Sequence, residues 1–285
     1  MFRYAICNET WGDVPFADAC RRAADAGYGG IEVAPFTLAR EFGKTADRLT
    51  DAERAGLRRT AADAGLEIVG LHWLLVPPPD GLHLTTPDAQ VRARTAAYLA
   101  DLAHLCADLG GSILVLGSPK QRSVPEGLDA ASARAHFVES IGPCLDACAA
   151  RGGIRLCLEP LGPGETDFLN TLAEARTMIG AAGGRPECRT IFDVKAAVTE
   201  GSPLPDLIAG NADIVAHVHA NDANRRGPGF GDVDFVPILG ALARAAYGGW
   251  VSVEVFDYSP DPHTIARVSM ETLRSAEARV VGPNQ

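Results

Sequence analysis

Leu156-Cys157-Leu158-Glu159-Pro160 is a short apolar run that ends in a carboxylate, and three similar runs follow it in the 285-residue chain. These runs are Thr190-Ile191-Phe192-Asp193, Ala216-His217-Val218-His219 and Val251-Ser252-Val253-Glu254. A charged side chain at the end of an apolar strand is costly unless another group pairs with it. The pattern therefore predicts four successive strands whose ends share one polar site.

Strand-like runs alternate with longer helix-like stretches along the whole chain. We expect strands near residues 3–8, 30–34, 67–73, 112–117, 154–159, 189–193, 213–219 and 250–255. We expect helices near residues 16–27, 48–65, 87–110, 129–151, 170–182, 203–210, 235–246 and 262–280. Eight strand–helix units in a chain of this length predict an α/β fold, a closed (β/α)8 TIM barrel, as a single domain over residues 1–285.

Turn and cap residues agree with these boundaries. Gly27 and the stretch Tyr247-Gly248-Gly249 stand where a helix ends before a strand, as a left-handed cap requires. Asp88 and Thr166-Asp167 are expected to start helices. The loops Pro77-Pro78-Pro79 and 226–231 follow the third and seventh strands, so in a barrel they line the active site.

Composition narrows the function classes. The net charge of −10 argues against a nucleic-acid partner, because binding a phosphate backbone needs clustered Lys and Arg. The start of the chain resembles no secretory signal, and no apolar run approaches the ~18 residues of a membrane span. The seven irregularly spaced cysteines then indicate reduced thiols in a cytoplasmic protein with no membrane partner. The oligomeric state is left open, a homo-oligomer included.

The four strand-end side chains form a set suited to one divalent metal ion. Glu159, Asp193, His219 and Glu254 offer oxygen atoms and one imidazole, which favours Mn²⁺, with Mg²⁺ and Co²⁺ as alternatives. In a barrel they would come from strands five to eight, with the two glutamates approaching from opposite sides. That geometry predicts proton removal beside a carbonyl, an enediolate stabilised by the metal, and proton return by the second glutamate.

Several segments of the second half resemble the sugar isomerase/epimerase family, whose barrel is like that of xylose isomerase. The resemblance is carried by the segments 158–161, 165–171, 192–193, 217–225, 227–231 and 248–256. Ketose 3-epimerases, hydroxypyruvate isomerase and inosose dehydratase are members. The resemblance implies a metal-dependent isomerase or epimerase of a sugar or sugar-like hydroxy-ketone.

The resemblance also implies roles for particular residues. In the family, the positions of Glu159, Asp193, His219 and Glu254 hold the metal, and the two glutamates are the catalytic acid and base. The positions of Glu165 and Arg225 contact substrate oxygens.

One position departs from the pattern of the ketose epimerases. These enzymes often carry a substrate-binding His three residues after the metal Asp, where this chain has Ala196. Lys195 is an alternative donor, although strand alternation would turn its side chain away from the face used by Asp193.

The first half contributes further candidates for the pocket. His72 is an additional polar candidate, and Trp11 and Trp73 are candidates for an apolar wall against a sugar ring. Lys120 and Arg122 are candidates for holding a carboxylate or phosphate, with a surface role as the alternative. Two further charged residues on strands, Glu32 and His217, are expected near the pocket and in the core, respectively.

Three other functions remain open from the residues alone. A dehydratase or β-eliminating lyase on a keto-sugar, keto-glycoside or inosose would use the same metal and base. An abasic-site nuclease shares the barrel, but the acidic charge and the scarcity of extra histidines near strand ends argue against it. A sugar-binding protein without catalysis would not need the complete ligand set.

Overall fold

Eight parallel strands form a closed barrel, in which each strand pairs with its neighbours in sequence and β1 pairs with β8. The computed structural model describes residues 1–76 and 81–281. The strands are β1 Arg3–Cys7, β2 Gly30–Val33, β3 Glu67–Leu71, β4 Ile113–Leu116, β5 Arg155–Leu158, β6 Cys188–Asp193, β7 Val215–Ala220 and β8 Trp250–Val253. The expected (β/α)8 barrel fold is therefore confirmed.

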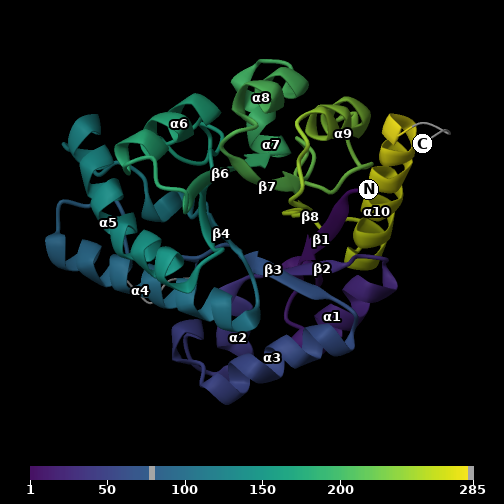
Figure 1. Cartoon of the computed structure of the whole chain (residues 1–285), viewed down its shortest axis with the longest axis horizontal. Helices are drawn as coiled ribbons and strands as arrows, with labels where there is room; N and C mark the ends of the chain where they lie inside the picture. Colours follow the sequence, from purple (N-terminus) through teal and green to yellow (C-terminus); the bar gives the residue numbers. More distant parts are fainter. Residues whose placement is uncertain (77–80, 282–285) are drawn as a thin grey trace.

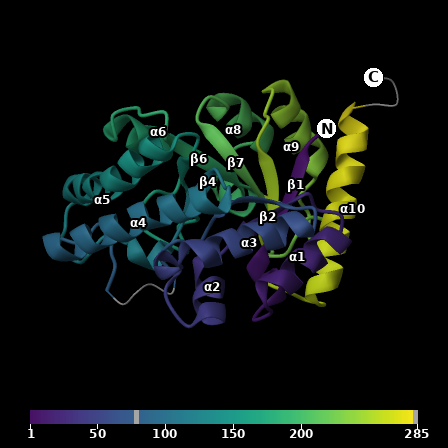
Figure 2. The same ribbon diagram turned by 60° about the horizontal axis from the view of Figure 1, so that its bottom comes forward.

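Helices surround the barrel, as Figures 1 and 2 show. They are α1 Phe16–Asp25, α2 Pro35–Phe42, α3 Asp51–Asp63, α4 Ala89–Leu109, α5 Ala130–Arg151, α6 Leu172–Ala181, α7 Val194–Ala197, α8 Leu204–Asn211, α9 Phe235–Arg244 and α10 Pro262–Val281. Short 3₁₀ helices span Asn8–Trp11, Ala46–Arg48, Pro119–Gln121 and Val198–Glu200. Helices α2 and α7 were not expected from the sequence; α7 follows β6 directly, and α2 begins two residues after the end of β2.

Helix starts follow side-chain caps. Asp88 caps α4 as expected, with its carboxylate accepting from the backbone N–H groups of Gln90 and Val91. The expected start at Thr166-Asp167 is wrong, because α6 begins after Thr171. Thr171 and Glu174 form a capping box there, and each side chain accepts a hydrogen bond from the other's backbone N–H.

The two glycine-rich helix ends use different residues. Gly27 has a φ of 88°, the left-handed conformation expected of a glycine after a helix. After α9 it is Ala246, with a φ of 52°, that takes this conformation. The expectation that Gly248 or Gly249 would do so is wrong, since the turn comes two residues earlier.

The barrel interior changes character along the strands. A cluster of small and apolar side chains fills its lower part: Ala5, Val69, Ile113, Val115, Cys157, Ile191 and Trp250. Cys157 and Ile191 precede Glu159 and Asp193 by two residues, so they face the same side one layer below. Glu159 and Asp193 therefore lie above apolar side chains at the carboxyl ends of their strands.

The structure also describes the cysteines and the apolar character of the helices. All seven cysteines are free and buried. Among the helices of the described ranges, none is both long and apolar enough to span a bilayer. The loop Pro77-Pro78-Pro79 lies outside the described residues.

Candidate functional site

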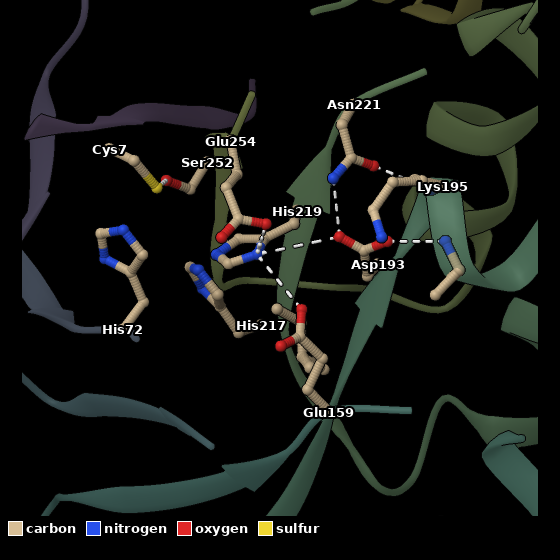
Figure 3. A network of polar contacts seen from close by, with 12 residues as sticks. Cys7, His72, Glu159, Asp193, Lys195, His217, His219, Asn221, Ser252 and Glu254 are labelled. Carbon is tan, nitrogen blue, oxygen red and sulfur yellow. Dashed lines mark hydrogen bonds and ion pairs between the residues drawn. The ribbon is translucent and has the colours of Figure 1, made fainter. Parts of the chain in front are cut away.

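Four side chains from successive strands converge at the carboxyl end of the barrel. Glu159 follows β5, Asp193 ends β6, His219 lies near the end of β7 and Glu254 follows β8. One ligand atom from each lies within 4.8 Å of those of the other three, and all four residues are at least about nine-tenths buried. In Figure 3, Glu254 and Glu159 approach His219 from opposite sides and Asp193 approaches from a third.

The imidazole of His219 lies at the centre of this cluster. Its Nδ1 lies 3.0 Å from Glu254 Oε2, 3.7 Å from Glu159 Oε1 and 3.9 Å from Asp193 Oδ2. Its Nε2 lies 3.2 Å and 3.3 Å from the two carboxylate oxygens of Glu32. An Nε2–H that donates to Glu32 leaves the Nδ1 lone pair directed at the three carboxylates.

These atoms fit a divalent cation. Within the described ranges, the buried atoms His219 Nδ1 and Glu254 Oε2 make no hydrogen bond of normal geometry, either with each other at 3.0 Å or with another group, although buried polar groups are normally satisfied. Three carboxylates and one neutral imidazole match the donor preference of Mn²⁺ or Mg²⁺ more closely than that of a metal that prefers thiolates.

Burial and crowding of like charges shift the pKa values in this cluster. Burial, together with the nearby carboxylates of Glu254 and Asp193, raises the pKa of Glu159 to about 7. Burial would also raise the pKa of Glu254, but the positive charges of His219 and His72 in their protonated forms lower it to about 2. Burial and like charge thus disfavour the ionised form of Glu159, and a bound cation would favour it.

A second layer of polar groups lies beside the cluster and orients it. Glu32 on β2 also accepts from His217, whose Nε2 lies 2.9 Å from its Oε2. His72 Nε2 pairs with Glu9 Oε2 at 2.9 Å, and its Nδ1 lies 3.9 Å from Glu32. His72 is fully buried in this layer, so the structure places it away from the pocket wall.

Amide and indole groups fix the carboxylates of the cluster. Asn221 Nδ2 donates to Asp193 Oδ2 at 2.7 Å, and Trp73 Nε1 donates to Glu254 Oε1 at 2.8 Å. The role of Asn221 was missed in the sequence, because this residue follows the end of β7, where strand alternation no longer applies. Metal ligands are commonly oriented by such partners.

Arg122 differs from the sequence expectation. It is fully buried, and its guanidinium donates to the backbone carbonyl of Glu159 at 2.6 Å. The same group reaches the carbonyls of Leu116 and Leu169. The expectation of an anion-binding or surface role is therefore corrected: Arg122 holds the carboxyl end of β5 in place.

A cavity of about 310 Å³ opens above the four-residue cluster. Glu159 and Glu254 line its base, and the other lining residues include Trp73, Lys120, Glu165, Arg225 and Phe256. The rings of Trp73 and Phe256 lie 5.9 Å apart and form an apolar wall. Trp11 is not among the lining residues, because its ring is buried in the core.

Comparisons with known proteins identify the family of the chain and several of its relatives. The family described as xylose isomerase-like TIM barrel matches residues 20–276. The D-psicose 3-epimerase of Agrobacterium fabrum (strain C58 / ATCC 33970) is 29% identical over 257 residues, which cover 89% of this chain and 83% of that protein. The 3-dehydro-D-guloside 4-epimerase of Escherichia coli (strain K12) is 33% identical over 131 residues, 46% of this chain and 50% of that protein.

Solved structures give the same fold. A structure of L-ribulose 3-epimerase superposes with a TM-score of 0.82 at 20% identity, covering 100% of this chain and 99% of that one. The resemblance expected from the sequence motifs is confirmed by the family match, which spans most of the barrel. The chain belongs to the xylose isomerase-like TIM barrel family.

Proposed function

We propose that the protein is a divalent-metal-dependent isomerase or epimerase that acts on a sugar or a sugar-like hydroxy-ketone. The named relatives, which are epimerases of keto-sugars and keto-glycosides, support an enzyme acting on sugars. The observation that carries the proposal is the set of convergent donor atoms at the base of the pocket, two of them buried without a hydrogen-bond partner.

In this proposal Glu159, Asp193, His219 and Glu254 hold one ion, with Mn²⁺ as the favoured metal. A divalent ion bound there supplies positive charge that stabilises the negative oxygen of a substrate that has lost a proton beside its carbonyl. Asn221 and Glu32 keep Asp193 and His219 in their binding orientations.

Glu159 and Glu254 are the proposed acid and base. Their carboxylates line the same cavity from β5 and β8, so a sugar bound between them has one carboxylate on each face. One glutamate removes the proton from carbon, and the other returns a proton to the opposite face. Positioned acid–base catalysis of this kind contributes about 10²–10⁴-fold to a rate.

The rest of the pocket suits a polyhydroxylated ligand. The Glu165 carboxylate can accept hydrogen bonds from hydroxyl groups, and the Arg225 guanidinium can donate to substrate oxygens. Trp73 and Phe256 offer an apolar surface to the C–H face of a sugar, and Lys120 stands at the exposed side of the cavity. Ala196, at the position where ketose epimerases often carry a His, offers no side-chain donor.

The proposed function is tested by proton exchange. The purified protein is incubated in D₂O with Mn²⁺ and a panel of ketoses, inososes and 3-keto-glycosides, and NMR follows deuterium incorporation beside the carbonyl. We expect at least one compound to gain deuterium and to convert to an isomer of unchanged mass, and the Asp193→Asn variant to be silent.

Two results would count against this assignment. A product lighter by water or an alcohol would assign the protein to elimination, the chemistry of a dehydratase or lyase. Absence of exchange across the whole panel, with metal bound, would contradict the proposed function.

A further inference from the structure

Lys195 places a positive charge beside Glu165, a residue that lines the pocket. It lies in α7, two residues after Asp193, and only 10% of its side chain is exposed. Its Nζ lies 2.7 Å from Oε2 of Glu165, which lines the cavity. The side chain does not turn away as strand alternation would require, because β6 ends at Asp193 and a helical turn begins with the next residue.

Glu165 depends on this contact for its orientation. It lies in the loop between β5 and α6, outside any helix or strand, and 39% of its side chain is exposed. Among the described residues, Lys195 is the hydrogen-bond partner of its carboxylate, through Oε2. The other oxygen, Oε1, is left as an acceptor at a wall of the cavity.

A second contact fixes the ammonium group itself. Lys195 Nζ lies 5.0 Å from the ring centroid of Phe256, within the range of a cation–π interaction. The guanidinium of Arg225 lies 5.6 Å from the same centroid. Phe256 therefore packs beside two cations and against Trp73, which places Lys195 in the same assembly as the apolar wall of the pocket.

We propose that Lys195 is a positioning residue for substrate recognition: it holds Glu165 so that Oε1 accepts a hydrogen bond from a sugar hydroxyl. The inference rests on the proposed function, because it takes the ligand to be a polyhydroxylated sugar. Lys195 makes no contact with the acid and base positions in this account. Lys195 is expected to strengthen binding of the substrate and of the transition state equally. Its loss should therefore raise KM and leave kcat unchanged.

The test compares four single variants, and the double variant of Lys195→Met with Glu165→Gln, on the sugar that the wild type converts. Lys195→Met keeps the length of the side chain but removes the charge, Lys195→Arg keeps the charge, and Glu165→Gln removes the partner's charge. Lys44→Met is the matched control, because Lys44 makes an ion pair of the same 2.7 Å length with Glu53 on another part of the surface.

We expect Lys195→Met and Glu165→Gln each to raise KM by about 10- to 100-fold, the size of a charge-assisted hydrogen bond, with kcat within about threefold of wild type. The double variant should cost little more than either single change, because both remove one interaction. Lys195→Arg should recover part of the KM. Metal affinity should not fall in any variant, and Lys44→Met should bind as the wild type does.

A purely structural Lys195 would give a different result. Fully additive effects in the double variant, or a KM for Lys195→Met equal to that of Lys44→Met, would overturn the inference. If Lys195→Met does not fold, a Glu165→Gln variant with wild-type KM overturns it equally.

Crystal structures of the wild type and of Lys195→Met give a readout that needs no turnover. We expect the Glu165 carboxylate to leave its place at the cavity wall in the variant, and an unmoved Glu165 would overturn the inference. A wild type that converts no sugar would instead contradict the proposed function, while the position of Glu165 still decides the role of Lys195.

Discussion

Two buried glutamates at the carboxyl ends of barrel strands have opposite electrostatic surroundings. Glu32, on β2, accepts hydrogen bonds from His217 and His219. Burial would raise its pKa, but the two imidazoles hold it well below the ordinary value. Glu159, after β5, lies beside two other carboxylates, and burial with this crowding raises its pKa to about 7.

The difference shows that neighbours, rather than residue type or place in a strand, separate an orienting carboxylate from a candidate ligand. Glu32 is already matched by hydrogen-bond donors, so it fixes the tautomer and direction of His219. Glu159 belongs to a group with three carboxylates and one imidazole, in which negative charge is in excess. Excess buried charge of this kind is stabilised by a bound cation.

The largest expected effect is the loss of catalysis when either Glu159 or Glu254 in the four-residue cluster is changed. Glu159→Gln and Glu254→Gln keep the size of each side chain but remove a proton acceptor, so each should lower kcat by about 10²–10⁴-fold. With metal confirmed in both, NMR in D₂O should show one variant that no longer exchanges the substrate proton. The other should still exchange it without forming product.

Near wild-type turnover in both variants would show that neither glutamate is the base. If only one variant is impaired, a single base that serves one face becomes the better description.

A smaller effect, on metal affinity, is expected when Glu32 is changed. Glu32→Gln replaces an acceptor for two imidazoles with an amide, and changes to groups that orient metal ligands typically cost 10–100-fold in metal affinity. Calorimetric titration with Mn²⁺ should show this loss, together with a lower midpoint of thermal unfolding. The matched control is Glu67→Gln, because Glu67 is an exposed residue at the start of the next strand. Equal Mn²⁺ affinity in Glu32→Gln and Glu67→Gln would show that Glu32 does not orient a metal ligand.

A third change leaves both glutamates intact and is expected to have the smallest effect. Arg225 lines the cavity and lies over Phe256, without contact to the four donor side chains. Arg225→Ala should therefore lower kcat/KM by about 10-fold or more through the loss of a charged hydrogen bond, at unchanged metal content. Steady-state kinetics with the converted sugar measure kcat/KM, and elemental analysis measures the metal content. Unchanged kinetics would make Arg225 a solvated loop residue.

The sequence allowed the barrel and the four converging side chains to be predicted for one physical reason. Strand alternation is periodic, and parallel strands bring their carboxyl ends to the same edge, so Glu159, Asp193, His219 and Glu254 were expected to share one site. The spacing of His217 and His219 also predicted that both side chains lie on one face of a strand, with His217 deeper in the barrel.

Other features were not predictable because periodicity ends where the strands end. Glu9 lies in a 3₁₀ helix after β1, and its pairing with His72 joins residues 63 positions apart. The direction of Lys195 depends on the start of α7, and the burial of Arg122 depends on carbonyl groups from three different segments. Each of these contacts is tertiary, and no local pattern specifies it.

The central claim is that the four strand-end side chains hold one divalent ion. Elemental analysis of the wild type, Asp193→Asn, His219→Ala and the control Glu67→Gln, each dialysed against the same Mn²⁺ buffer, tests it most directly. The account predicts about one ion per chain in the wild type and the control, and little or none in the other two variants. Full occupancy in Asp193→Asn and His219→Ala, or no metal in the wild type, would contradict it.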